Sequence, residues 1–119
     1  MKWGVSVKFK SFDYNSIEVK KSNSKERKEF NENTRDENII YFFYKDDECL
    51  YVGESKKTLH DRCFINTPKH SEKDFFIQSN KIRIIVLETC VGDFERQTLE
   101  KNFILAFYSA GHPLHNEKA

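Results

Sequence analysis

The chain has 119 residues, enough for one modest hydrophobic core but not for two. With 38% hydrophobic residues, 33% charged residues and a net charge of +1, it is unlike proteins that coat nucleic acid by charge alone. No apolar run approaches the ~20 residues that would cross a bilayer, and the N-terminus lacks the apolar stretch of a signal peptide. Three cysteines without metal-type spacing predict reduced thiols. We therefore expect a cytoplasmic protein with no membrane partner.

Residues 1–37 are interpreted as a polar N-terminal extension with a possible short strand and helix. Alternating apolar side chains at Trp3, Val5, Val7 and Phe9 suggest the strand. The following KKSNSKERKEFNENTRDEN stretch is charged and nearly free of apolar residues, which leaves an exposed helix or a mobile segment as alternatives. Its basic KKSNSKERK part is either solvated or contacts DNA, and the extension is also a candidate for contacts in a homodimer or with another protein.

Residues 38–119 form the second predicted unit, which opens with a β-hairpin. The continuous apolar run Ile39–Tyr44 is typical of a strand that is buried on both faces. The residues Asp46-Asp47-Glu48 favour a turn, and Leu50–Gly53 is the predicted return strand.

The length of this turn decides where two tyrosines lie. A three-residue turn pairs Phe43 with Tyr51 and places Tyr41 and Tyr51 on the same face of the sheet. A two- or four-residue turn places them on opposite faces, because side chains alternate along a strand with a period of two.

Further elements follow along the chain. Lys57–Ile65 has a helical pattern that stops before Pro68. His70–Gln78 predicts another short helix with two phenylalanines facing inward, and Ile82–Leu87 predicts a third, central strand. The expected fold class is α+β, with a three-stranded antiparallel sheet flanked by helices.

A long C-terminal helix begins near Gly92, with Asp93 as its expected N-cap, and ends at Gly111. Its predicted buried stripe consists of Leu99, Phe103, Ala106, Phe107 and Ala110. Glu100 borders this stripe, whereas its neighbours Glu95, Arg96 and Lys101 are expected to point outward.

Glu100 and Arg62 are therefore candidates for function. A carboxylate beside a buried stripe needs a partner, either a lysine or arginine at the rim or a ligand. Arg62, nine residues after Gly53, is either an ordinary surface arginine or a group that recognises phosphate.

Several short motifs stand in a particular order. IIY is followed after nine residues by YVG, then by Arg62, by Glu100 within LEKNFI, and by HPLHN, which ends at Asn116. This order and spacing over roughly residues 38–117 resembles the GIY-YIG nuclease domain family. The resemblance implies a three-stranded antiparallel sheet with flanking helices, and a hydrolase that cuts phosphodiester bonds, usually in DNA, with one Mg²⁺ or Mn²⁺ ion. The implied function is therefore a metal-dependent endonuclease.

The resemblance also implies roles for individual residues. Tyr41 would help to deprotonate the attacking water, and Tyr51 would help to hold the water and the scissile phosphate. Arg62 would neutralise the phosphate in the transition state. Glu100 would be the single protein ligand to the metal.

Other positions are implied to shape the site or to differ from the family. Gly53 and Asn116 match substrate-side positions, where Gly53 lets the backbone run close to the site and Asn116 closes it from the C-terminal side. The family often carries a histidine a few residues after the arginine, and His70 and His60 are candidate substitutes because Asn66 stands there instead. Two further departures are Ile39 in place of the family's glycine and Glu54, where many relatives carry a lysine.

Two alternatives to a nuclease follow from the same residues. One is a catalytically weak or inactive module of this fold that binds DNA or a protein partner. The other is an ordinary structural domain, which requires the two tyrosines on opposite faces of the sheet and Glu100 paired away from both.

Overall fold

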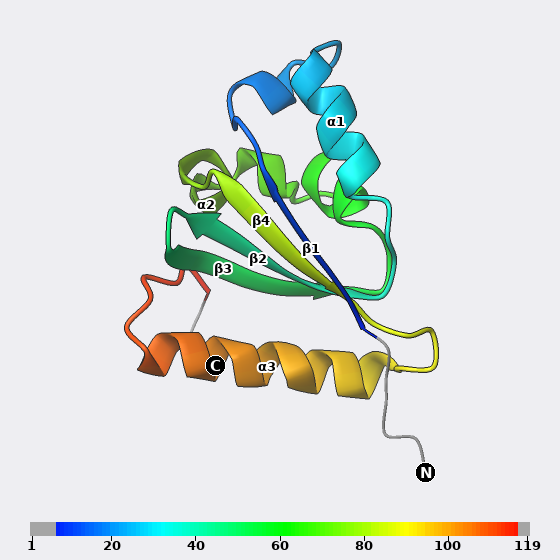
Figure 1. The fold of residues 1–119 in the computed structure, drawn as a ribbon, viewed down its shortest axis with the longest axis vertical. Coiled ribbons are helices and arrows are strands. Elements are labelled where there is room, and N and C mark those ends of the chain that lie inside the picture. Colours follow the sequence, from blue (N-terminus) through cyan, green and yellow to red (C-terminus); the bar gives the residue numbers. More distant parts are fainter. Residues whose placement is uncertain (1–6, 117–119) are drawn as a thin grey trace.

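A four-stranded antiparallel sheet forms the centre of the structure, a computed structural model that describes residues 7–116 (Figure 1). The strand order is β1-β4-β2-β3. The strands are β1 (Lys8–Asp13), β2 (Ile39–Lys45), β3 (Glu48–Ser55) and β4 (Lys81–Val86). The α+β class is confirmed, and the expected three strands are β2, β3 and β4. The count of three was wrong, because the N-terminal extension adds β1 beside β4.

The N-terminal strand lies later in the chain than the alternation predicted. Trp3 and Val5 fall outside the described residues, and β1 begins only after Val7. Phe9 is largely exposed, so it does not anchor the strand. Phe12 instead packs its ring edge-on against Phe30, with 5.8 Å between ring centroids.

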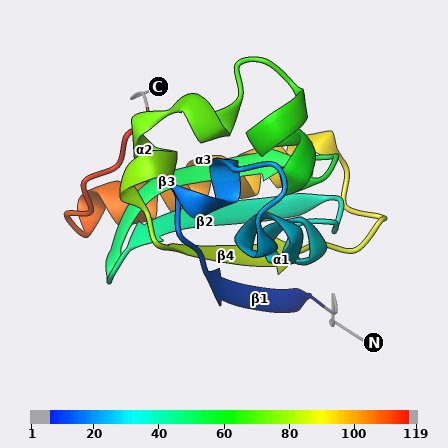
Figure 2. The same cartoon turned by 90° about the horizontal axis from the view of Figure 1, so that it is seen from above.

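Helices cover both faces of the sheet (Figures 1 and 2). The face opposite α3 carries the 3₁₀ turn η1 (Glu18–Lys20), α1 (Lys25–Asn33), the π-helical turn η2 (Asp61–Ile65), the 3₁₀ turn η3 (His70–Glu72) and α2 (Asp74–Gln78). The long helix α3 (Asp93–Ser109) covers the other face near β3 and β2. The helix expected over Lys57–Ile65 is therefore shorter and ends as a π-turn, and the helix expected over His70–Gln78 is split in two at Lys73.

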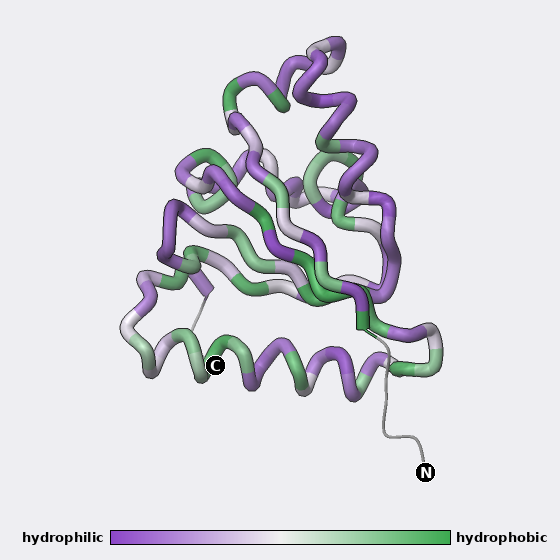
Figure 3. The backbone as a smooth tube through the Cα atoms, in the orientation of Figure 1, coloured by the Kyte–Doolittle hydropathy of each residue, from purple (hydrophilic) through white to green (hydrophobic). Residues whose placement is uncertain are grey.

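The helical alternative for the charged N-terminal stretch is the one the structure adopts. Ser24 caps α1 by accepting a hydrogen bond from the backbone N–H of Arg27 at 2.9 Å. Phe30 is the buried residue of this otherwise hydrophilic helix (Figure 3). One aromatic anchor therefore attaches α1 to the core.

Strand β2 is buried on both faces, as predicted, and separates two apolar clusters. Tyr41 and Phe43 face the cluster that includes Phe30, Phe75 and Phe76. The alternate residues of β2 face the second cluster, whose members are Ile40, Phe42, Tyr44, Cys49, Val52 and Leu87, with Phe103 and Phe107 of α3 packed against it.

The buried stripe predicted for α3 is only partly correct. Phe103 and Phe107 pack on the sheet, but Leu99, Ala106 and Ala110 are exposed. The reason is that α3 lies mainly over β3 and β2, so it presents a narrow line of residues to the sheet. Two local predictions also fail, since Gly92 is the N-cap residue in place of Asp93, and Arg96 is buried although an outward orientation was expected.

The hairpin reaches the predicted pairing by an unexpected route. Lys45 pairs with Glu48, so the turn has two residues, Asp46 and Asp47, and a two-residue turn was expected to separate the tyrosines. A β-bulge at Leu50 adds one unpaired residue to β3 and shifts the register back. Phe43 therefore pairs with Tyr51, as the three-residue alternative required.

Gly53 is required at its position because the ring of Tyr41 lies against it. The two residues are directly paired across β2 and β3. A Cβ atom at position 53 would lie 2.3 Å from Cζ and 2.4 Å from Oη of Tyr41. The glycine thus admits the tyrosine ring, a close approach that any side chain would block.

Within residues 7–116, no helix is long and apolar enough to cross a membrane. The three cysteines are free; Cys49 and Cys63 are buried and Cys90 is exposed.

We predict that Gly53→Ala destabilises the protein by about 2 kcal/mol, because the added methyl group overpacks against Tyr41. Chemical denaturation measures this free energy of unfolding. In a Tyr41→Ala background the same glycine substitution should cost far less, since the clashing ring is gone. An equal cost in both backgrounds would show that the ring is not the reason for the glycine.

Candidate functional site

Tyr41 and Tyr51 lie on the same face of the sheet. An ordinary structural domain with coincidental residues was expected to have them on opposite faces. Their ring centroids are 6.3 Å apart and their planes differ by 29°. Tyr51 also stacks on Phe75 of α2, with centroids 4.0 Å apart and planes only 7° from parallel. Tyr51 is half-buried, whereas Tyr41 is 1% exposed.

His70 forms a buried pair with Tyr41. Its Nε2 atom lies 2.6 Å from Oη of Tyr41, and the residue is 3% exposed. Burial, with Arg62 and Lys73 nearby, lowers the pKa of His70 to about 3. Burial also raises the pKa of Tyr41 well above its usual value. The phenol therefore keeps its proton and the imidazole is neutral, and the imidazole tautomer sets which of the two groups donates in their hydrogen bond.

Arg62 projects from η2 into the same region. Its charge opposes the burial that raises the pKa values of Tyr41 and Tyr51, and it contributes to lowering that of His70. A cleft of about 530 Å³ lies beside these groups, and it is lined by Tyr51, Arg62, Pro68, His70, Lys73, Asp74, Phe75, His115 and Asn116. Four of the predicted site residues thus border one cleft, and Tyr41 lies beneath them.

Glu100 does not line this cleft, but it lies close to Tyr51. Burial and the charge of Glu54 raise the pKa of Glu100, and a hydrogen bond from the backbone of Glu54 and the charge of Lys101 oppose the rise. The charge of Glu100 in turn contributes to the raised pKa of Tyr51. No ion pair involving Glu100 is present in the described part of the chain, so it is not the rim glutamate paired with a lysine or arginine that one alternative expected.

The C-terminal segment covers the free edge of β3. The side-chain amide of Asn116 donates to the carbonyl of Val52 at 2.8 Å, and its Oδ1 accepts from the N–H of Val52 at 2.9 Å. The N–H of His115 donates to the carbonyl of Leu50 at 2.6 Å. The N–H of Cys49 donates to Nδ1 of His112 at 2.9 Å. Asn116 thus closes one side of the cleft through a backbone-like pairing with β3.

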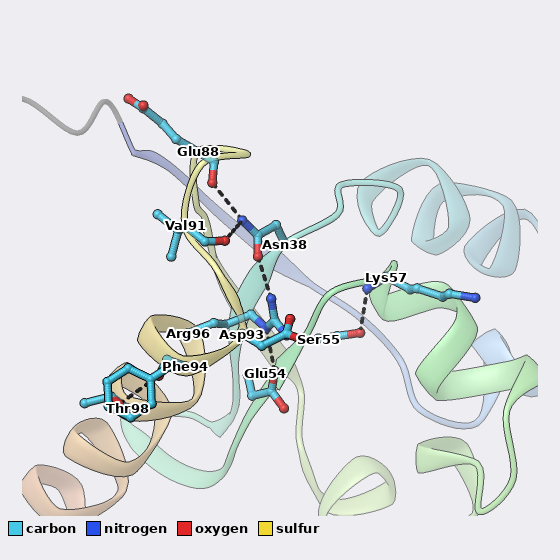
Figure 4. Close-up of polar contacts among 10 residues, drawn as sticks. All are labelled: Asn38, Glu54, Ser55, Lys57, Glu88, Val91, Asp93, Phe94, Arg96 and Thr98. Carbon is cyan, nitrogen blue, oxygen red and sulfur yellow. Dashed lines mark hydrogen bonds and ion pairs between the residues drawn. The ribbon is translucent and has the colours of Figure 1, made fainter.

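Glu54 is held by a buried arginine that the sequence did not reveal as inward-facing. Nε of Arg96 lies 2.5 Å from Oε1 of Glu54, and the arginine is 4% exposed (Figure 4). The spacing could have indicated this inward orientation. Arg96 precedes Glu100 by four residues and Phe103 by seven, which places all three on one face of the helix.

One carboxylate near the tyrosines is a candidate ligand to a metal ion of the implied kind. Among the residues that the structure describes, no group of three or more histidine, cysteine, aspartate or glutamate side chains is placed to hold a metal. Glu100 is a half-buried carboxylate without a cationic partner in that part of the chain. Such a carboxylate can be one oxygen ligand to Mg²⁺ or Mn²⁺, with substrate phosphate and water as the remaining ligands.

Comparison of the chain with models of protein families, with curated proteins and with solved structures found no match.

Two further side chains at the cleft, Lys73 and His115, were not among the predicted site residues. Lys73 lies between η3 and α2, and its charge contributes to lowering the pKa of His70. The side chain of His115 is positioned by the tail's attachment to β3. Lys73 lies outside the quoted motifs, and His115 lies within HPLHN, where a role was implied only for Asn116, so the fold identifies both as cleft residues.

We predict a pH-dependent stability that belongs to His70. The unfolded chain binds a proton at this residue below about pH 6.5, whereas the folded protein does so only near pH 3. The free energy of unfolding should therefore fall, by up to about 3 kcal/mol for this group, as the pH drops from 6.5 to 4. Denaturation of wild type and His70→Gln at several pH values measures the difference.

The Gln variant should lose this part of the slope, because it has no proton to bind in that range. His115→Gln, which replaces an exposed histidine at the same cleft, is the matched control for the substitution. An identical slope in wild type and His70→Gln would contradict the buried neutral state of His70.

Proposed function

We propose that the protein is a metal-dependent endonuclease that hydrolyses phosphodiester bonds in DNA, with a GIY-YIG-like fold over residues 38–119. One observation carries the proposal: Tyr51, Arg62 and His70 border one cleft, with Tyr41 hydrogen-bonded beneath it. Glu100, the candidate metal ligand, lies beside Tyr51. A cleft lined by an arginine suits an anionic polymer.

Tyr41 would take the proton of the attacking water, and His70 would orient the Tyr41 hydroxyl through their hydrogen bond. The phenol must first release its own proton to solvent, because His70, with a pKa of about 3, is too weak a base to hold it. Arg62 opposes the burial that raises the pKa of Tyr41 and so favours the phenolate, which then accepts a proton from water. The resulting hydroxide attacks phosphorus, and the leaving oxygen departs with the electron pair of the broken bond.

Arg62 and Tyr51 would hold the phosphate during attack. The planar guanidinium of Arg62 donates to two phosphate oxygens and balances the charge that develops on them. Tyr51 is fixed by its stacking on Phe75, so its hydroxyl is preorganised at the cleft wall. A divalent ion at Glu100 would supply Lewis acidity at the phosphate and the leaving oxygen.

A second candidate is a non-catalytic module that binds DNA through the same cleft. The 1% exposure of Tyr41 favours it, because the Tyr41 hydroxyl must meet water for the hydrolytic path. In such a module Arg62 and Lys73 would still contact phosphate, but Tyr41 and His70 would transfer no proton.

We expect the wild-type protein to nick supercoiled plasmid or cut branched DNA with Mg²⁺ or Mn²⁺, and to be inactive with chelator. Glu100→Gln and Tyr41→Phe should each lower the cleavage rate by about 100-fold or more. Glu95→Gln, on the exposed side of the same helix, is the matched control and should cleave normally. DNA binding without cleavage in the wild type would favour the non-catalytic module, and cleavage that survives both site substitutions would refute the site.

We also expect Lys73 and His115 to contact the phosphate backbone next to the scissile bond, because they border the cleft beside Arg62. Lys73→Ala should weaken metal-free DNA binding and reduce the slope of log affinity against log salt by about one. Fluorescence anisotropy over a salt series measures both quantities.

Lys45→Ala, at the exposed end of β2, is the control that should leave the salt slope unchanged. The same slope for wild type and Lys73→Ala would place the DNA backbone elsewhere. His115→Gln should give a smaller loss of affinity than Lys73→Ala.

A further inference from the structure

Arg96 is the most completely bonded charged side chain near the proposed site. Its Nε donates to Oε1 of Glu54 at 2.5 Å, its Nη1 to Oδ1 of Asn38 at 2.9 Å, and its Nη2 to Oδ1 of Asp93 at 2.8 Å (Figure 4). Arg96 lies on α3 one turn before Glu100. Its guanidinium therefore joins the start of β2, the end of β3 and the first turn of α3.

Asn38 extends this network to the loop before α3. Its backbone has a φ of +57°, which asparagine tolerates better than most residues. Its Nδ2 donates to the carbonyls of Glu88 at 2.7 Å and Val91 at 3.1 Å. All three guanidinium nitrogens of Arg96 thus have protein acceptors, so Arg96 is not itself free to bind a ligand.

The network matters to the proposed site because of Glu54. This glutamate directly follows Gly53, and its charge contributes to raising the pKa values of both Tyr51 and Glu100. An unpaired carboxylate here would repel a phosphate backbone that approaches Tyr51. Arg96 supplies the compensating positive charge from the buried side of the same strand.

We propose that Arg96 is a positioning residue that holds and neutralises Glu54, so that this carboxylate does not repel a DNA backbone bound near Tyr51. This inference rests on the proposed function, since it takes DNA as the ligand of the cleft. A purely structural role for Arg96 makes a different prediction. Under our proposal, the loss of DNA affinity on removing Arg96 comes from the unpaired negative charge of Glu54.

The test compares four variants for metal-free DNA binding by anisotropy, with thermal unfolding as the measure of structural damage. Arg96→Met leaves Glu54 charged and unpaired, and it should weaken binding by roughly tenfold. Glu54→Gln alone should bind at least as well as wild type. The double variant Glu54→Gln/Arg96→Met should return to within about twofold of wild-type affinity, although it lacks the same ion pair.

Asp93→Asn is the matched control. It removes an exposed partner of Arg96 but leaves Glu54 held, so its affinity should equal that of wild type. Arg96→Lys keeps the positive charge but cannot make all three hydrogen bonds of the guanidinium, and it should lower DNA affinity by no more than about threefold.

The double variant decides the outcome. If it binds DNA as weakly as Arg96→Met, the role of Arg96 is structural and the proposal is overturned. If Arg96→Met fails to fold, a folded double variant with wild-type affinity supports neutralisation, and a double variant that also fails to fold refutes it. Cleavage is measured in a separate assay. A wild-type protein that binds DNA but never cuts it would refute the endonuclease proposal, while the affinities of the variants would still decide the role of Arg96.

Discussion

The register of the β2–β3 hairpin is the constraint on which the rest of the site depends. Side chains alternate along a strand, so a shift of one residue would send Tyr51 to the opposite face from Tyr41. The two-residue turn alone would produce that shift, and the bulge at Leu50 reverses it. With the register fixed, the ring of Tyr41 lies on Gly53 and its hydroxyl meets His70. Tyr51 then stacks on Phe75 at the wall of the cleft.

The free edge of β3 explains why distant parts of the chain meet at this hairpin. An edge strand exposes N–H and C=O groups that need partners. The tail supplies them at Cys49, Leu50 and Val52, and the Glu100 carboxylate accepts from the backbone of Glu54. The hydrogen bonds that pair the backbone groups of the β3 edge therefore also bring Asn116 and Glu100 close to the tyrosines.

Charge is distributed unevenly around this edge. Arg62 acts on three buried or half-buried groups from the cleft side, and Arg96 balances Glu54 from the α3 side. Glu100 forms no ion pair in the described part of the chain, although the charge of Lys101 acts on it. A nearly neutral protein thus gathers Arg62 and Lys73 at one cleft, with Asp74 at the same wall.

The sequence by itself determined the elements whose signals are local. The unbroken apolar run fixed β2 as a strand buried on both faces, and spacing alone brought out Glu100 as an unusual helix residue. The sequence could not determine features that depend on packing: the bulge, the fourth strand, the exposure of Leu99, or the inward turn of Arg96. Periodicity identifies which residues share one face of a helix, but the contacts of α3 with β3 and β2 decide how wide a face is buried. Tertiary structure alone placed His70 on Tyr41, because that hydrogen bond joins residues 29 apart whose meeting depends on the whole hairpin and the helices above it.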